Sequence, residues 1–426
     1  MNMIYRKSLF LAAAAAIVLG GAARAEDKPA IEVLHYWTSG GEAKAKGTLQ
    51  KQFEDAGGTW TDTKVAGGGG DAETAALRAS VAAGNPPGAA QIKGPTIHEY
   101  AEQGALDNID DVAKAENWDA VLPPQIKDLV TYEGHYVGAP VNIHRINWVW
   151  INPAALTKAG VQAPKSWDDF FASVDKFKAA GIIPMAHPGG GENWDGMLFE
   201  PVLLSTCGGD VYKKAFVDLD DATLRGDCMK KSFDLFRKLA TVIKDTDKNY
   251  VGRPWNEGTQ MVMKGQAAMQ IMGDWAKGEF SAAGLKPGTD YLCTAVWPDS
   301  GFILNSDSFG FFTSPKSTAS NESGKKLLAK LIMDKSFQET FNLYKGSIPA
   351  RTDVPRDKFD SCATQSMDDL AAAVKNNSLV PTLAHQVAVK DAIRGPAVSA
   401  LSKFFESDQS TDEGVKALAD GIASAK

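Results

Sequence analysis

The chain has 426 residues, of which 45 are basic and 52 are acidic, so its formal net charge is −7 at pH 7. This acidic balance argues against nucleic acid or an anionic membrane surface as the main partner, because both carry negative charge. The length exceeds what one hydrophobic core usually supports and predicts two domains.

The first 25 residues have the pattern of a cleavable signal peptide. Arg6 and Lys7 precede an apolar run over residues 9–19, and Ala23-Arg24-Ala25 offers a small-x-small motif for cleavage before Glu26. The apolar run is short for a spanning helix, although a retained N-terminal anchor is the alternative. No cysteine follows the run, so lipid attachment is not indicated. Removal of 25 of the 426 residues leaves 401, which we expect in the periplasm without membrane insertion, and the net charge becomes −10 because three basic residues are lost.

Short strand-like runs alternate with amphipathic helical runs in the remaining chain, which predicts an α/β fold. Strands are expected first at residues 31–37, 62–66 and 89–92, and helices at 42–53, 72–83 and 96–103. Further strands are expected at residues 136–141, 148–152, 268–272, 302–305 and 309–313, and helices at 167–180, 231–243 and 259–264. Helical patterns then dominate residues 325–344 and the chain from residue 384 onward. Because loops at the carboxyl ends of strands line the ligand crevice of open α/β sheets, residues in those turns are binding candidates.

Four cysteines remain after residue 25, and four cysteines allow three disulfide connectivities. Export permits disulfides, and the absence of any C-x-x-C spacing argues against zinc or thioredoxin-like chemistry. We favour Cys207–Cys228, which closes a short loop, and Cys293–Cys362, which ties distant segments. Free buried thiols are the alternative.

Aromatic and charged residues cluster where the first strand is expected to end. Tyr36 and Trp37 suit stacking against the C–H face of a sugar ring, and Glu42 can accept hydrogen bonds from sugar hydroxyls. Strand packing is the alternative for the two rings. For Glu42 the alternative is a capping box, because Ser39-Gly40-Gly41-Glu42 matches S-x-x-E.

The other candidates follow later strands or turns. Lys93 and Trp275 follow expected strands, as does Asp307. Lys345 precedes a Gly-Ser turn, and His385 falls in a helical pattern. A solvated lysine or a partly buried histidine is the ordinary alternative for such residues. The glycine run at residues 67–70 lacks a following Gly-Lys-Ser/Thr, so it indicates a tight turn rather than a nucleotide site.

Enzymatic motifs are absent from the sequence. The six histidines show no metal-binding spacing, and no G-x-S-x-G motif is present, so we expect no metal, cofactor or enzymatic activity. A secreted glycoside hydrolase remains an alternative, because the separation of its paired carboxylates is spatial and leaves no fixed sequence spacing.

Seven collinear motifs carry a resemblance to a known family. They are HYWTSGGE at residues 35–42, AGGGG at 66–70, GNPPG at 84–88, QIKGP at 91–95, PVNIHR at 140–145, MGDWAK at 272–277 and KGSIP at 345–349. Together they resemble bacterial periplasmic glucose-binding proteins, which belong to the family 1 extracellular solute-binding proteins of ABC sugar importers. The resemblance covers nearly the whole chain.

The resemblance implies two α/β lobes joined by three crossovers near residues 139–142, 305–307 and 347–351. Lobe 1 would comprise residues 26–140 and 306–347, and lobe 2 residues 141–305 and 348–426. Trp37 and Trp275 would stack on the sugar. The hydroxyls would be bound by Glu42, Lys93, Asp307, Lys345 and His385.

Two departures from the family pattern bear on specificity. Tyr36 stands where close relatives carry a second tryptophan, and residues 187–194 form a longer loop. The expected function is capture of a neutral monosaccharide, glucose or a related aldohexose, by lobe closure, followed by delivery to an ABC permease. A receptor for another sugar, such as a disaccharide, is the alternative, and a monomer is expected.

Overall fold

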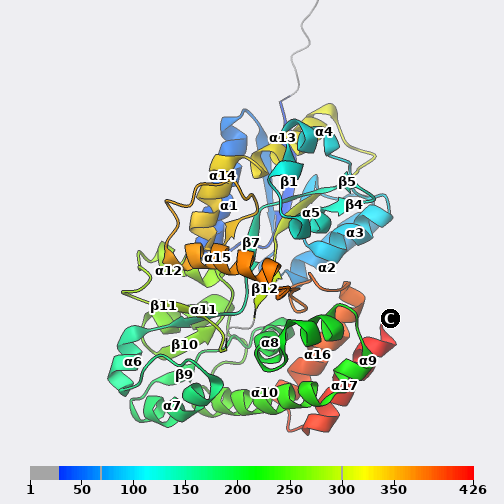
Figure 1. Ribbon diagram of the computed structural model, residues 1–426. Helices are drawn as coiled ribbons and strands as arrows, with labels where there is room; N and C mark the ends of the chain where they lie inside the picture. The colour runs from blue at the N-terminus through cyan, green and yellow to red at the C-terminus, as the bar shows by residue number, and fades with distance from the viewer. Residues whose placement is uncertain (1–27, 68–69, 299–300) are drawn as a thin grey trace, which may run out of the picture.

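The computed structural model describes residues 28–67, 70–298 and 301–426. The predicted signal peptide, as well as Gly68 and Gly69 of the glycine run, lies outside the described residues. Two lobes, each a β-sheet with flanking helices, are joined by a small third sheet (Figure 1). The predicted two-lobe α/β fold is confirmed.

Lobe 1 is built on a five-stranded sheet with the order β2-β1-β3-β13-β6. Its strands are β1 Ala30–His35, β2 Thr59–Lys64, β3 Ala89–Ile92, β6 Gly138–Pro140 and β13 Ser308–Phe311. The first three run parallel, and β13 is antiparallel to both β3 and β6. Strand β3 is buried along its whole length, as expected for a strand with neighbours on both sides and helices over the sheet.

The helices of lobe 1 follow these strands. They are α1 Gly40–Asp55, α2 Asp71–Ala82, α3 Gly94–Glu102, α4 Asp110–Ala115, α5 Pro124–Val130, α13 Ala319–Ile332 and α14 Lys335–Lys345, with a short 3₁₀ turn at Trp118–Ala120 and a hairpin of β4 Thr131–Tyr132 and β5 His135–Tyr136. The single helical run expected over residues 325–344 is two helices. Asp334 caps the second one, because its side chain accepts hydrogen bonds from the backbone N–H groups of Ser336 and Phe337.

Lobe 2 is built on a four-stranded sheet with the order β11-β8-β10-β9. The strands are β8 Trp148–Ile151, β9 Ile183–Met185, β10 Ala267–Ile271 and β11 Leu292–Ala295. The helices are α6 Pro153–Ala159, α7 Trp167–Ala179, α8 Glu192–Phe216, α9 Asp221–Leu224, α10 Asp227–Thr246, α11 Trp255–Met263, α12 Trp275–Ala282, α16 Asp391–Glu406 and α17 Thr411–Ser424.

Helix α8 was not expected from the sequence. It contains Pro201, and Gly208 interrupts it with a left-handed φ of 78°. Pro and Gly both disfavour the interior of a helix, so the local sequence argues against a helix here. Tertiary packing stabilises α8 in spite of them. The helical pattern expected from residue 384 begins later, at Asp391, and His385 lies in the turn before it.

The hinge sheet, with the order β14-β7-β12-β15, lies between the lobes (Figure 1). It is made of β7 Asn142–Arg145, β12 Phe302–Asn305, β14 Ile348–Pro349 and β15 Leu379–Pro381, and α15 Ser361–Lys375 lies against it. Residues 348–426, which the family resemblance assigns to lobe 2 as a whole, divide between the two cores. Ala350, Val354 and Phe359 pack in the lobe 1 core, whereas α16 and α17 pack in the lobe 2 core.

Both favoured disulfides are confirmed. Cys207 bonds to Cys228 and Cys293 to Cys362. The second one fastens β11 of lobe 2 to α15 beside the hinge sheet. Across the residues that the structure describes, no helix combines the length and apolar character needed to cross a bilayer.

Candidate functional site

A pocket lies between the lobes and is lined by residues from both lobes and from the hinge. Its empty space is about 290 Å³, including the part that opens to solvent. The lining residues, which define the inter-lobe pocket, are Tyr36, Glu42, Lys93, His144, Trp194, Trp255, Trp275, Asn305, Asp307, Lys345 and His385. Seven of the eight predicted sugar-binding residues are among them. Trp37 is the exception.

Tyr36 and Trp37 follow β1 and point to different sides of the chain, as successive residues in extended backbone do. Tyr36 faces the inter-lobe pocket, and its hydroxyl donates a hydrogen bond of 3.0 Å to Asp307 Oδ1. Trp37 packs in the lobe 1 core, with ring centroids 5.6 Å from Phe309 and 5.1 Å from Phe341. The expectation that Trp37 stacks on a ligand is therefore corrected, and Tyr36 supplies the aromatic face of lobe 1.

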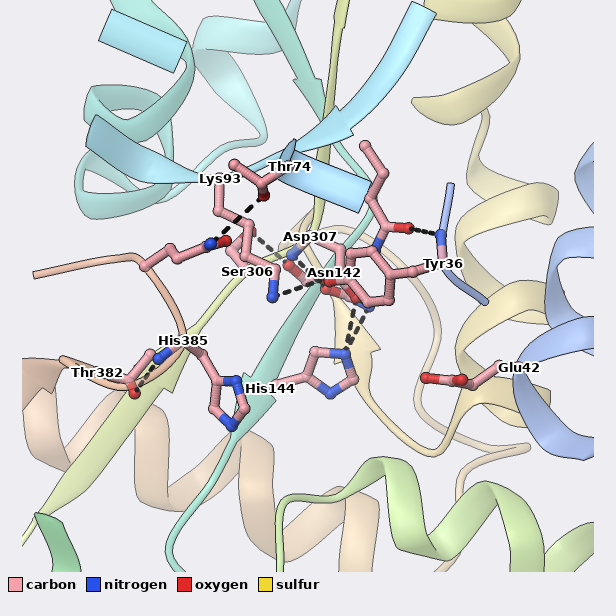
Figure 2. A network of polar contacts seen from close by, with 12 residues as sticks. Tyr36, Glu42, Thr74, Lys93, Asn142, His144, Ser306, Asp307, Thr382 and His385 are labelled. Atoms are coloured by element: carbon pink, nitrogen blue, oxygen red, sulfur yellow. Dashed lines mark hydrogen bonds and ion pairs between the residues drawn. The ribbon is translucent and has the colours of Figure 1, made fainter. Parts of the chain in front are cut away.

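Asp307 is the centre of a buried hydrogen-bond network. Its carboxylate accepts from the side chains of Tyr36, Asn142 and His144, as Figure 2 shows, at 3.0–3.1 Å. Lys93 Nζ lies 3.7 Å from Asp307 Oδ1 and 5.1 Å from the centroid of the Tyr36 ring. The segment between β12 and β13 thus carries a carboxylate, and side chains from lobe 1 and from the hinge strand β7 contact it.

The protonation of this network follows from its burial and its charges. Burial favours a neutral Asp307, but the hydrogen bond from His144 and the nearby Lys93 hold the pKa of the carboxyl well below its usual value. Burial lowers the pKa of Lys93, and Asp307 opposes that shift. Burial would also lower the pKa of His144, but Asp274 and Asp307 raise it overall. The two carboxylates that flank His144 therefore outweigh its burial.

Asp274 links the hinge to the loop that carries Trp275. It forms a short contact with His144 Nδ1, and its second oxygen accepts a hydrogen bond of 3.0 Å from the backbone N–H of Arg145. Both oxygens are therefore used by β7 residues. Since Trp275 is the next residue in the chain and begins α12, the position of its ring is tied to the hinge strand.

The ring of Trp275 forms the aromatic wall of the inter-lobe pocket in lobe 2. Trp194 and Trp255 lie around it, with ring centroids 6.4 and 6.5 Å away, and the imidazole of His385 lies 5.3 Å away. Trp194 and Trp255 were missed from the sequence as site residues. Trp194 stands in the loop noted as longer than in the family, which is the one signal that could have found it.

Glu42 and Lys345 form an ion pair at the wall of the inter-lobe pocket, with Nζ 3.0 Å from Oε1. The capping-box alternative for Glu42 is wrong, because Ser39 makes no side-chain cap bond at the start of α1. The start of α1 is satisfied from lobe 2 instead, since the backbone N–H of Gly41 donates to Glu279 Oε1 at 2.8 Å. Lys345 Nζ also lies 5.7 Å from the Trp275 ring.

Several buried polar atoms of the pocket lining have no hydrogen-bond partner among the described residues. They are Trp275 Nε1, Asn305 Oδ1 and His385 Nε2. Burial, followed by the nearby Lys93 and Arg394, holds the pKa of His385 well below its usual value, so its imidazole is neutral at pH 7. Donors and acceptors of this kind can bind a ligand that carries hydroxyl groups. The described residues contain no group of three or more His, Cys, Asp or Glu side chains suited to a metal ion.

Comparisons with known proteins agree with this architecture. A family model for bacterial extracellular solute-binding proteins matches residues 37–308. The chain is 45% identical over 423 residues to a probable sugar-binding periplasmic protein of Mesorhizobium japonicum, covering 99% of this chain and 100% of the relative. It is 44% identical over 430 residues to a protein of the same description from Brucella melitensis, with both chains covered completely.

Solved structures match at low sequence identity and bear on the fold alone. The bacterial solute receptor AcbH matches with a TM-score of 0.77 at 17% identity, covering 93% of this chain and 99% of that chain. A chitin oligosaccharide binding protein matches with a TM-score of 0.76 at 19% identity, covering 94% and 99%. The family model and the two relatives that match along their full lengths show that this chain belongs to the bacterial extracellular solute-binding proteins.

Proposed function

We propose that the protein is the periplasmic sugar-binding component of an ABC transporter, and that it encloses one neutral monosaccharide, glucose or a related aldohexose, between its lobes. The observation that carries the proposal is the inter-lobe pocket, where aromatic rings and charged hydrogen-bonding groups from both lobes face one small space. The 45% identical relative is described as a probable sugar-binding periplasmic protein, which supports a sugar as the ligand. The matched folds are described as a chitin oligosaccharide binding protein and a bacterial solute receptor.

The charges in and behind the inter-lobe pocket favour a neutral ligand. Three basic side chains, Lys93, His144 and Lys345, are paired with three carboxylates, Glu42, Asp274 and Asp307. An anionic ligand such as a sugar phosphate would bring a charge that no unpaired cation of this set compensates, and burying such a charge is costly. A neutral polyol can instead share the existing pairs through its hydroxyls, and hydrogen bonds to charged groups are the stronger kind.

The rings that line the inter-lobe pocket suit one sugar ring between them. Tyr36 of lobe 1 and Trp275 of lobe 2 both line this pocket. A pyranose can lay its C–H face on the indole of Trp275 while its hydroxyls reach Lys93, Asp307 and His385. We propose these roles for the residues that line the inter-lobe pocket.

Binding would occur without chemistry, by stabilising lobe closure. A sugar that contacts Glu42 and Lys93 from lobe 1 and Trp275 from lobe 2 binds the closed state more tightly than the open one. The closed surface, formed by a monomer, would then be presented to the membrane permease. Micromolar affinity requires about −8 kcal/mol, within reach of stacked rings and several buried hydrogen bonds.

A disaccharide is the second candidate, and one observation favours it. A neighbouring groove, with about 800 Å³ of empty space that includes open solvent, shares Tyr36, Glu42, Trp194 and Trp255 with the inter-lobe pocket. A second ring could lie there. In that case a disaccharide would bind more tightly than its component monosaccharide.

The test is a thermal-shift screen followed by isothermal titration calorimetry of the purified mature protein. The panel is glucose, galactose, mannose, xylose, maltose, cellobiose and glucose 6-phosphate. A ligand that binds only the native state raises the melting temperature, so we expect glucose or another aldohexose to give the largest shift and the phosphate none. Stabilisation by sugar phosphates alone would contradict the proposal. Tighter binding of disaccharides would select the second candidate.

A further inference from the structure

A buried glutamate lies under the turn that carries His385 into the inter-lobe pocket. Glu200 is on α8 and is fully buried. Its carboxylate accepts hydrogen bonds from the Thr382 hydroxyl at 2.8 Å, from the Tyr212 hydroxyl at 2.9 Å and from the backbone N–H of Ala384 at 3.1 Å. The backbone N–H of Leu383 makes a further short bond to it. Three of these four donors belong to the turn.

Thr382 passes this connection on to His385. The Thr382 hydroxyl donates to Glu200. It also accepts a hydrogen bond of 3.3 Å from the backbone N–H of His385, and Figure 2 shows this second bond. The Thr382 carbonyl accepts from the N–H groups of Val387 and Ala388 at 3.1 and 2.9 Å. The turn is thus hydrogen-bonded from below by Glu200 and closed on itself by Thr382.

The backbone of this turn needs such support. Gln386 has a φ of 64°, a left-handed conformation that is unfavourable for a residue with a side chain. His385 precedes it, and the His385 ring lies 5.3 Å from Trp275 and 5.4 Å from Trp194. A relaxed turn would therefore move the imidazole away from both rings.

Burying the Glu200 carboxylate costs free energy, and packing of the core alone does not require a carboxylate at this position. The hydrogen-bond partners of Glu200 in the described chain are hydroxyl and backbone N–H groups, with no cationic side chain among them. Burial raises the pKa of Glu200 to about 7, although the bonds from Thr382 and Tyr212 lower it. A buried carboxylate without a cation is expensive, so its value lies in the geometry it imposes.

We propose that Glu200 is a positioning residue of the binding site, which fixes the turn at residues 382–386 and thereby the His385 imidazole and the affinity for sugar. This inference rests on the proposed function for its effect on affinity. Glu200 does not line the inter-lobe pocket, so its effect on the affinity for sugar is indirect and acts through the position of His385.

The test compares Glu200→Ala with Glu200→Gln, and Thr382→Val with Thr382→Ser, in the full mature protein. Calorimetry measures affinity for the sugar that stabilises the wild type most, and hydrogen exchange by mass spectrometry measures protection of peptides spanning residues 381–388 without ligand. We expect Glu200→Ala and Thr382→Val to weaken binding at least tenfold and to deprotect this segment. Glu200→Gln and Thr382→Ser keep an acceptor or a hydroxyl and should stay within threefold of the wild type.

Leu239→Ala controls for general destabilisation, because Leu239 is buried in α10 of the same lobe and does not line the inter-lobe pocket. It should lower the melting temperature without weakening binding. In a His385→Ala background, Glu200→Ala should cost less than a further threefold in affinity, since both changes remove the same contact. Unchanged affinity and unchanged exchange in a folded Glu200→Ala protein would overturn the proposal, as would losses that match those of Leu239→Ala.

The two proposals fail in different ways. If the wild type binds no sugar, the proposed function fails, while the exchange of residues 381–388 still reports whether Glu200 holds the turn. If the wild type binds sugar and the Glu200 and Thr382 variants bind equally well, only the positioning role is wrong.

Discussion

The carboxylate of Glu42 and the ammonium of Lys345, 303 residues apart in the sequence, lie 3.0 Å from each other at the wall of the inter-lobe pocket. Both side chains are buried, so removal of either charge leaves the other without its partner in a poorly solvated place. The pair is a means of presenting two strong hydrogen-bonding groups to a ligand at no net charge.

We expect Glu42→Gln and Lys345→Met each to weaken sugar binding at least tenfold, which is about 1.4 kcal/mol. The double variant should lose less than the two single losses combined, because each single change also unpairs its neighbour. Calorimetry measures all three. Lys51→Met, which breaks an exposed pair with Asp55, is the matched control and should bind normally. Additive losses in the double variant would show that the two residues act independently.

Trp275 and Trp37 provide a contrast between an aromatic residue of the pocket lining and one of the core. Trp275→Ala should weaken sugar binding at least tenfold while the protein stays folded, since it removes the stacking surface of lobe 2. Trp37→Phe should lower the melting temperature with little change in affinity, because Trp37 packs against Phe309 and Phe341. Titration calorimetry and thermal denaturation of both variants check this. Normal binding by a folded Trp275→Ala protein would contradict the stacking role.

Ion pairs between α2 of lobe 1 and the start of α16 in lobe 2 should add to the stability of the closed form. Asp71 pairs with Arg394 at 2.6 Å, and Arg78 pairs with Asp391 at 2.7 Å. The double variant Asp71→Asn/Arg78→Met should bind sugar about threefold to tenfold more weakly at low salt. The reason is that each partly exposed ion pair contributes up to about 1 kcal/mol to the stability of the closed form.

The same double variant has a salt signature. In 0.5 M NaCl its deficit should shrink, because screening weakens the pairs of the wild type as well. Arg225→Met, which removes a pair within lobe 2, should leave the affinity unchanged at either salt concentration. A deficit that is insensitive to salt would point to lost packing instead.

Glu73 gives the protein a pH dependence of stability. It is buried in α2, and its burial raises the pKa to about 8, although the nearby Lys93 lowers it. Between about pH 4.5 and pH 8 the folded protein holds a proton that the unfolded chain has released, so this group makes the free energy of unfolding fall as the pH rises through that range.

Glu73→Gln removes this dependence. From pH 4 to pH 8.5, the difference between the free energies of unfolding of the variant and the wild type should change by about 3 to 5 kcal/mol in favour of the variant. Urea denaturation at the two pH values measures the difference, and comparison of the two proteins cancels the other titrating groups. A constant difference between them would mean that Glu73 titrates normally.

The two disulfides should stabilise the protein unequally. Their cysteines are 21 and 69 residues apart, and a cross-link over a longer loop removes more entropy from the unfolded chain. Replacing both cysteines of a pair with serine should cost about 3 kcal/mol for Cys207–Cys228 and about 4 kcal/mol for Cys293–Cys362. Chemical denaturation checks the order. The reverse order would indicate that residual structure in the unfolded chain dominates.

Much of the fold and of the candidate site could be predicted from the sequence, because both depend on local signals. Strand ends followed by Gly or Pro marked Lys93 and Trp275, and folding brings both residues to the inter-lobe pocket. Strands β3 and β12 have the predicted bounds, since apolar runs between turn residues define them. The favoured disulfide pairing, one of the three that four cysteines allow, is also the one present.

The missed features depend on information that is spatial. Tyr36 and Trp37 are adjacent, and sequence alone does not say which side of β1 faces the other lobe. Helix α8 was hidden by Pro201 and Gly208, so Trp194 near its start and Glu200 within it could not be placed. The partners of His144 lie 130 and 163 residues further along the chain, and no local pattern encodes such pairs.

The order of strands in lobe 1 also shapes how the chain folds as it emerges with its N-terminus first. Strand β13 lies between β3 and β6, yet it is made about 170 residues after β6. Until residue 311 has emerged, β3 and β6 lack their common neighbour, and two unpaired edges are exposed to other chains. A chain that has emerged only as far as residue 307 is therefore a target for chaperones and for aggregation. The lobe 2 sheet, by contrast, needs nothing beyond residue 295 to be complete.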